Sequence, residues 1–255
     1  MDLSRSVYEY EPDHGRDRAL VDALLKLVER YPRLGFGKLF PILRREGAIW
    51  NHKRVHRVYC MLKLNIRRKG KQRLPTRNPE PLVVPNAFGQ AWSMDFMSDA
   101  LVCGRRFRTL NIVDDFNREV LAIEVDLNIP AQRVIRVLER ISESRGLPSK
   151  IRVDNGPEFV SVALADWCER KGILLDFIEP GRPMQNSFVE RFNRSFRVEI
   201  LDAYLFDTLH EVREHASRWI HIYNEERPHE SLGNLTPVEY RMTHSAGKAS
   251  INAWH

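Results

Sequence analysis

Three acidic residues of this chain stand where a carboxylate can do chemistry. Asp95 lies inside the apolar segment 92–96, where a charge is costly to bury unless it is paired or binds a cation. Asp154 directly follows the β-rich segment 150–153, and Glu190 lies in a segment with helical periodicity. A site made only of such oxygens is the kind that Mg²⁺ prefers. These residue types together indicate a divalent-cation site, if the fold brings them to one place.

Two Mg²⁺ ions held ~3.5–4 Å apart would clamp the attacking and leaving oxygens of an in-line phosphodiester displacement. Any one of these acids alone is more often a helix cap or a surface charge, so the hypothesis rests on the combination. It requires the strands that carry Asp95 and Asp154 to be neighbours, because both side chains then lie at one edge of a sheet and a helix can bring Glu190 to them.

Residues 91–203 have the pattern of a mixed α/β domain. Three β-rich segments at hairpin-like spacing precede a helical segment, and strand-like and helical segments then alternate. This order predicts a mixed sheet with helices on its faces. We expect strands at 92–96, 107–113, 119–125, 150–153 and 173–178, and helices at 131–145, 161–171, from about 185, and at 208–223, with a polar tail after the last helix.

The first 74 residues predict a small helical domain instead. Apolar residues recur at helical spacing in 18–30, 38–46 and 52–63, and Asn51 is placed to cap the third helix. Pro41 fits the second helix only if it lies in the first turn. Two short helices joined by a tight turn, with a basic second helix, are typical of a helix-turn-helix, although many such pairs are plain packing units.

Basic residues gather in the N-terminal part of the chain. Residues 1–80 carry 19 Lys and Arg against 9 Asp and Glu, a net charge of +10, whereas residues 81–255 carry a net charge of −4. Such a surface favours a polyanion as partner, because each neutralised phosphate releases counterions. A solvated basic face is the alternative. The residues that we expect to contact nucleic acid here are Lys53, Arg54, Arg57, Arg67, Arg68 and Lys69.

A polar stretch with four prolines separates the two regions. We expect a helical DNA-binding domain at 1–74, a Pro-rich linker at 75–90, an α/β core at 91–203, and a C-terminal helix and tail at 204–255. The first residues lack the apolar segment of a secretory signal, and no apolar run approaches the ~18 residues that a membrane span needs. We therefore expect a cytoplasmic protein without a membrane partner.

Recognisable motifs surround the second and third acids. Asp154 begins the run Asp-Asn-Gly-Pro-Glu-Phe, Glu190 begins Glu-Arg-Phe-Asn, and 35 residues lie between the two acids. Further motifs stand at 183–186, 196–197, 223–224, 227–229, 231–233 and 236–237. Their order and spacing closely resemble those of the DDE transposases of bacterial insertion sequences, which are related to retroviral integrases. The resemblance spans about residues 30 to 242.

This resemblance implies an RNase H-like, retroviral-integrase-type core behind an N-terminal helix-turn-helix-like domain. It implies a transposase that nicks DNA at insertion-sequence ends to free a 3′-OH, which then attacks target DNA. Asp95, Asp154 and Glu190 would be the catalytic residues and the ligands of two Mg²⁺ ions, for which Mn²⁺ can substitute. Asn186 and Arg197, one turn before and two turns after Glu190, are expected at the DNA.

Several alternatives stay open at this point. The chain could be an RNase H-like nuclease that cuts without joining, or a non-catalytic DNA-binding regulator derived from a transposase. The usual mark of such a regulator, loss of one carboxylate, is absent. The resemblance also implies a homo-oligomer on DNA, in a nucleoid-associated bacterial setting. In this family a separate upstream reading frame often supplies another helix-turn-helix and a leucine zipper. This chain shows neither zipper heptads nor such an upstream segment, so we expect either a partial gene product or one that needs a partner.

Two further groups of residues look functional. Asp114 and Asp115 end a predicted strand, where we favour a turn or cap role over a catalytic one. His52, His56 and Cys60 share a helix face, as in the zinc-binding N-terminal domain of retroviral integrases. A second Cys at usable spacing is missing, which argues against zinc.

Overall fold

The computed structural model describes residues 15–66, 84–179 and 183–249. The chain divides into two compact units, residues 1–71 and residues 72–255, and each is described here by itself. Of the basic residues expected at nucleic acid, Arg67, Arg68 and Lys69 lie outside the described residues.

The N-terminal unit contains three short helices, α2 (Arg18–Arg30), α3 (Phe36–Arg45) and α4 (His52–Met61). Asn51 caps α4 as expected, because its side chain accepts a hydrogen bond from the backbone N–H of Lys53 at 2.8 Å. The apolar faces of the three helices meet in a small core. Its fully buried residues include Leu20, Leu24, Leu39, Leu43, Val55 and Val58.

Pro41 does not interrupt α3, contrary to the sequence-based expectation. The helix begins at Phe36, so the proline lies past its first turn. The missing N–H of Pro41 removes one helical hydrogen bond. Packing against α4 offsets this loss: the ring centroids of Phe36 and His56 are 4.7 Å apart, and those of Phe40 and His52 are 4.8 Å apart.

The second unit is built on the mixed five-stranded sheet that the sequence predicts. Its strands are β1 (Ala91–Ala100), β2 (Arg106–Asp114), β3 (Val120–Asp126), β4 (Lys150–Val153) and β5 (Leu174–Phe177), in the spatial order β3-β2-β1-β4-β5. The first three strands pair antiparallel, whereas β4 pairs parallel with both β1 and β5. The first strand runs four residues past its expected end at Phe96, because β2 pairs with it along that length.

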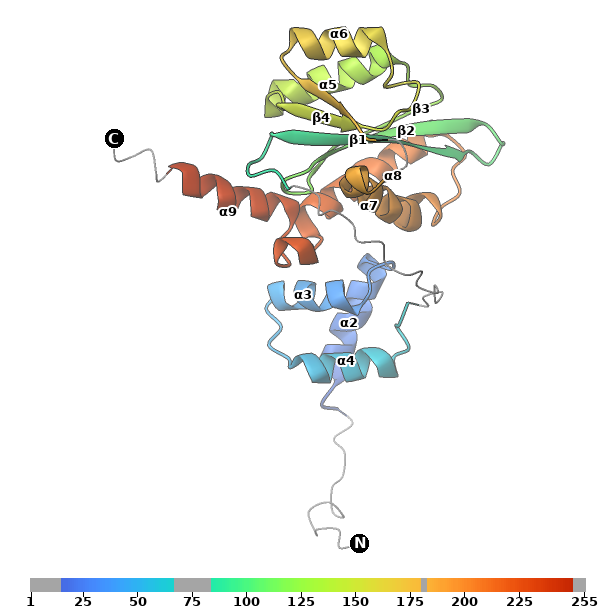
Figure 1. Cartoon of the computed structure of the whole chain (residues 1–255). Coiled ribbons are helices and arrows are strands. Elements are labelled where there is room, and N and C mark those ends of the chain that lie inside the picture. The colour runs from blue at the N-terminus through green and yellow to red at the C-terminus, as the bar shows by residue number, and fades with distance from the viewer. Residues whose placement is uncertain (1–14, 67–83, 180–182, 250–255) are drawn as a thin grey trace, which may run out of the picture. The chain divides into compact units, whose positions relative to one another are not determined.

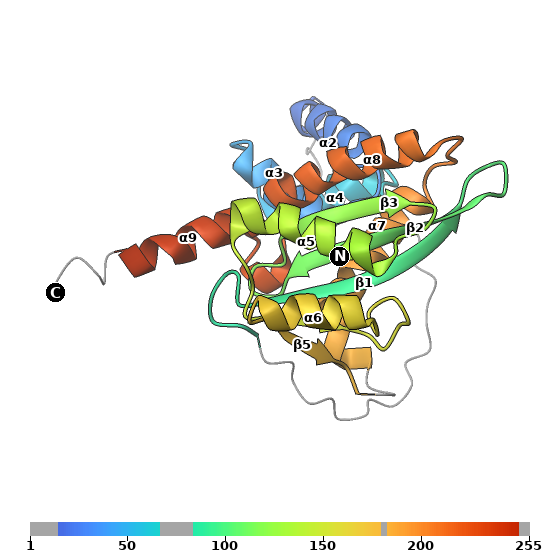
Figure 2. The ribbon, with the colours of Figure 1, turned by 90° about the horizontal axis from the view of Figure 1, so that it is seen from above.

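Helices cover both faces of this sheet (Figure 1). α5 (Ala131–Arg145) and α6 (Val162–Arg170) lie on one face, and α7 (Ser187–Phe196) and α8 (Leu209–His221) lie on the other. Each face has its own apolar cluster, one around Trp92, Leu110 and Ile112, the other around Phe107, Phe192 and Trp219. Viewed from above, α5 and α6 run side by side over the strands (Figure 2). None of the described helices has the length and apolar character needed to cross a bilayer.

The segment after residue 223 differs from the expected polar tail. It contains a π-helical turn (Ile222–Glu226), a 3-10 turn (Glu230–Leu232) and the helix α9 (Pro237–Ala249). The start of α9 is a capping box: the Glu239 N–H donates to Thr236 Oγ1 at 3.2 Å, and Glu239 Oε2 accepts from the Thr236 N–H at 2.8 Å. Pro237 then occupies a first-turn position, where its missing N–H costs nothing.

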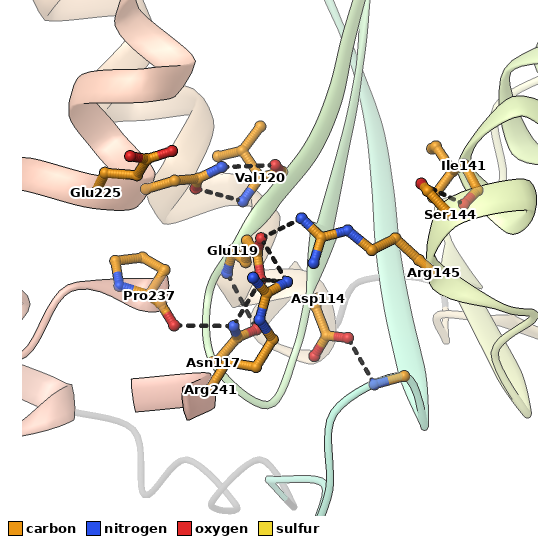
Figure 3. Close-up of polar contacts among 12 residues, drawn as sticks. Asp114, Asn117, Glu119, Val120, Ile141, Ser144, Arg145, Glu225, Pro237 and Arg241 are labelled. Atoms are coloured by element: carbon orange, nitrogen blue, oxygen red, sulfur yellow. Dashed lines mark hydrogen bonds and ion pairs between the residues drawn. The ribbon is translucent and has the colours of Figure 1, made fainter. Parts of the chain in front are cut away.

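A buried carboxylate ties α9 to the sheet (Figure 3). Glu119, in the turn between β2 and β3, is 1 % exposed and accepts hydrogen bonds from Arg145 of α5 at 2.6 Å and from Arg241 of α9 at 3.0 Å. Asn117 donates both to Glu119 at 2.9 Å and to the Pro237 carbonyl at 3.0 Å. Because two cations share one carboxylate, the docking of α9 depends on Glu119.

Candidate active site

Asp95 and Asp154 lie on adjacent parallel strands. Asp95 is in the middle of β1, and Asp154 directly follows the last residue of β4. Arg152 pairs with Ser93, so continuing this register by two residues sets Asp154 level with Asp95. The expected neighbourhood of the two strands is therefore confirmed. The parallel pairing brings one carboxylate from each strand to the same place on the sheet.

Glu190 belongs to the first turn of α7, which packs on β1 and β2. Burial, together with the negative charges of Asp154 and Glu190, raises the pKa of Asp95 from 3.8 to about 6. Glu190 itself is exposed, yet the protein around it removes enough water to raise the pKa of its carboxyl. Asp154 and Glu190 thus both lie near enough to Asp95 to act on its charge.

Backbone and amide donors hold the Asp95 carboxylate. The Phe96 N–H donates to Oδ1 at 2.8 Å, and Asn193 of α7 donates through Nδ2 to Oδ2 at 2.6 Å. Asn193 in turn accepts from Nδ2 of Asn111, the residue that pairs with Asp95 on β2, at 2.7 Å. A chain of two buried amides therefore fixes both Asp95 and the helix that carries Glu190.

The loop after β4 fixes Asp154. The Gly156 N–H donates to Asp154 Oδ1 at 3.0 Å, and Asn155 Nδ2 donates to the Ile178 carbonyl at 2.8 Å. A Cβ on Gly156 would lie 2.9 Å from Asp154 Oδ1, so a larger residue here would displace the carboxylate. Three residues on, Phe159 is fully buried and anchors the loop in the core.

The three carboxylates fit a hard divalent cation in chemistry. They offer oxygen donors alone, and their mutual repulsion is the kind that a cation relieves. Within the described parts of the chain, no three His, Cys, Asp or Glu side chains gather tightly enough to hold a metal ion as they stand. The three carboxylates thus lie near one another around β1, but they are not as close together as the ligands of a bound metal ion.

Comparison with known proteins shows which family this sequence belongs to. Two models, both described as integrase core domain, match residues 85–183 and 171–237. An uncharacterized 31.7 kDa protein of insertion element IS407 from Burkholderia multivorans is 41% identical over 246 residues, 96% of this chain and 88% of that protein. The chain belongs to the integrase core domain family. A second insertion-element protein, from IS476 of Xanthomonas euvesicatoria, is 36% identical, over 97% of this chain and 72% of its own length.

A solved structure agrees with the fold of this integrase core. A chain of the simian T-cell lymphotropic virus intasome, solved in complex with PP2A regulatory subunit B56 gamma, matches with a TM-score of 0.52 at 17% identity. The match covers 85% of this chain and 73% of that chain. The mixed sheet with helices on both faces is therefore the RNase H-like fold of integrase cores, as the sequence indicated.

Among the residues expected at DNA that the structure describes, all but Lys53 already have protein partners in this integrase core protein. Arg54 and Arg57 both pair with Asp17, at 2.8 and 2.5 Å, whereas Lys53 is exposed. Arg197 pairs with Asp99 at 2.7 Å and also donates to the Ser98 carbonyl at 2.7 Å.

Two details at α7 differ from simple helical spacing. α7 ends at Phe196, and Arg197 begins a π-helical turn (Arg197–Leu201) rather than continuing the α-helix. Asn186 is buried and donates to the Met94 carbonyl at 3.3 Å, next to Asp95, while its Oδ1 has no partner among the described residues. Asn186 thus lies against β1 at the start of the glutamate helix.

The other groups that the sequence singled out have structural roles. Asp114 accepts from the N–H groups of Gly89 and Phe116, both at 2.8 Å, and Asp115 accepts from Ser93 and pairs with Arg152 at 3.1 Å. The expected turn role is confirmed. Burial raises the pKa of Asp114 to about 6 as well, so a raised pKa alone does not identify the active site.

Sequence reasoning missed Asn193, although a signal was present. Asn193 lies three residues after Glu190 and therefore on nearly the same face of the helix. A polar residue on the buried side of an amphipathic helix needs a partner, and Asp95 is that partner.

Proposed function

We propose that this chain is a DDE transposase, a polynucleotidyl transferase that cleaves and joins DNA at the ends of an insertion sequence. The observation that carries the proposal is the parallel pairing of β1, which contains Asp95, with β4, which Asp154 directly follows; the charges of Asp154 and Glu190 both act on Asp95. Its relatives in insertion elements support the choice of substrate. We infer that Mg²⁺, or Mn²⁺ in its place, is the cofactor and that two ions bind in the active complex.

When bound, the ions would supply Lewis-acid activation of water and of the 3′-OH, and stabilise the leaving oxygen. The chain's own residues prepare for this. Asn193 and the Phe96 N–H orient Asp95, and the Gly156 turn orients Asp154. Both devices stabilise the ionised carboxylates, which are the forms that bind a cation. In the metal-free protein the pKa of Asp95 is about 6, so below that pH a proton competes with a cation for its carboxylate.

We further propose that the active species is a homo-oligomer on DNA, in the bacterial cytoplasm, with insertion-sequence ends and target DNA as substrates. Lys53, Arg54 and Arg57 would then face DNA from α4, and the basic residues Arg67, Arg68 and Lys69, which follow in the sequence, would be further phosphate contacts. Arg197 would exchange its carboxylate partner for a phosphate. An upstream-frame product is a further candidate partner.

The test is incubation of the purified chain with labelled element ends, target DNA and Mg²⁺, scored separately for nicked and joined products. Asp95→Asn and Asp154→Asn should abolish both, whereas Asp166→Asn, an exposed acid on α6, should change neither. Nicking without joining would identify a nuclease instead. Tight DNA binding with neither product would identify a DNA-binding regulator.

A further inference from the structure

The loop that carries Asp154 is fastened to β2 by an ion pair. Glu158, four residues after Asp154, turns back toward the sheet and pairs with Arg108, whose guanidinium lowers the pKa of the Glu158 carboxyl. The two side chains are 27% and 22% exposed, so the pair is partly shielded from water. Fifty residues separate its partners in the chain. Only the fold brings them together.

An aromatic stack supports the same contact. The Arg108 guanidinium lies 4.4 Å from the centroid of the Phe96 ring, and Phe96 packs on Phe159 with 4.9 Å between centroids. Phe96 is the neighbour of Asp95 in β1, and Phe159 is the neighbour of Glu158. Arg108 therefore contacts Phe96, the residue after Asp95, and Glu158, in the loop that begins with Asp154.

Glu158 also lies against the turn that orients Asp154. Its Oε2 would be 3.3 Å from a Cβ placed on Gly156, whose N–H donates to Asp154 Oδ1. The N–H groups of Phe159 and Val160 both donate to the Gly156 carbonyl at 3.0 Å. Glu158 thus contacts the Gly156 turn, and that turn holds Asp154. A displacement of Glu158 would shift the turn and, through it, the Asp154 carboxylate.

We propose that Arg108 is a positioning residue: through Glu158 it holds the Asp154 loop against the sheet and so sets the place of the Asp154 carboxylate relative to Asp95. This rests on the proposed function only in naming the reaction that Asp154 serves. The link from Arg108 to the loop is a statement about the chain itself, and it can be tested without substrate or metal.

The test is a charge-reversal cycle in the full chain, using Arg108→Glu, Glu158→Arg and the double variant. Each single reversal sets like charges against each other, and the double variant restores an opposite pair. Arg106→Glu is the matched control, because Arg106 is exposed on the same strand two residues away and so on the same face. Asp154→Asn is assayed in parallel as the catalytic null.

The first readout is amide hydrogen exchange over 156–160 in the metal-free protein. Each single reversal should speed exchange there on the order of tenfold, with exchange in α5 unchanged, and the double variant should return toward wild type. The second readout is the Mg²⁺ concentration needed for half-maximal nicking, which should rise in the single variants and recover in the double variant. If the ion pair only stabilised the fold, the single variants would have a lower melting temperature but would need the same Mg²⁺ concentration for half-maximal nicking.

Single reversals that leave loop exchange at the wild-type rate would overturn the proposal. So would a double variant as impaired as its single parents. Weaker DNA binding by Arg108→Glu with normal loop exchange would make Arg108 a DNA contact instead, which also overturns it. If Asp154→Asn nicks DNA normally, the proposed function fails, while the exchange data still decide whether Arg108 holds the loop.

Discussion

Replacing Asn193 by Leu should destabilise the protein in a pH-dependent way. Asn193 is buried, donates to Asp95 and accepts from Asn111. Leucine has the same number and branching of side-chain heavy atoms but makes neither hydrogen bond. Asp95 then loses a donor to its charged form, and the amide of Asn111, a residue with no exposed surface, is left without its acceptor.

The two losses set the size of the effect. A hydrogen bond to a charged group contributes about 1.5–3 kcal/mol, and an unsatisfied buried donor costs about 1–3 kcal/mol. Part of this is offset by the added apolar burial, so we expect about 2–4 kcal/mol near pH 7.5.

The pH dependence follows from the raised pKa of Asp95. The folded pKa of about 6 lies above the ordinary 3.8, so ionising Asp95 lowers the free energy of unfolding. That stability is fully present below pH 3.8 and is lost as pH rises to about 6. The Asn193 donor offsets that cost only when Asp95 is ionised. Near pH 5 Asp95 is mostly protonated, and the effect of Asn193→Leu should shrink to the Asn111 contribution, about 1–2 kcal/mol.

Denaturant unfolding followed by tryptophan fluorescence at both pH values measures this difference. Asn128→Leu, at an exposed site in the loop after β3, is the control and should change stability little at either pH. An equal loss at both pH values, or no loss near pH 7.5, would refute the assignment of Asn193 as support for the charged form of Asp95.

Three further outcomes are expected. Glu119→Gln should cost about 3–5 kcal/mol in thermal or denaturant unfolding, because Arg145 and Arg241 lose their shared carboxylate, whereas the exposed Glu143→Gln should cost little. A chain starting at residue 84 should bind DNA more weakly and with a shallower salt slope than the full chain; identical slopes would make the N-terminal charge incidental. Arg197→Glu should impair joining in a protein that still folds, with a modest fall in melting temperature because the new carboxylate faces Asp99, and wild-type strand transfer would exclude a DNA role.

The sequence predicted the sheet well because local pattern and chain order suffice for it. Three hairpin-spaced strands followed by alternating helices leave few ways to build a mixed sheet, and one of them sets the Asp95 strand beside the Asp154 strand. The extension of β1 past Phe96 could not be predicted, because Met97–Ala100 are ordered by pairing with β2 and not by their own apolar pattern.

Other features needed tertiary contacts or a closer look at short motifs. Pro41 is tolerated because Phe36 and Phe40 pack on α4, which no helix rule foresees. The start of α9 was readable, since Thr236-Pro237-Val238-Glu239 is a capping-box sequence. In the site, the carboxylates were visible from their spacing. Asn193 could have been suspected as a polar residue on the buried side of the glutamate helix, but its partner and that of Arg108 lie about 50 to 100 residues away and only the fold identifies them.

The most direct test of the central claim is Glu190→Gln, measured on one preparation for Mg²⁺-dependent nicking and joining, for DNA affinity and for metal-free melting temperature. The change keeps size and removes one charge. Nicking and joining should both fall by at least about 100-fold. DNA affinity should be kept or tightened, and the metal-free melting temperature should stay the same or rise, because Glu190 raises the pKa of Asp95 by repulsion. The exposed Glu169→Gln on α6 is the matched control. Near-normal nicking by Glu190→Gln would contradict the assignment of this residue to the catalytic site.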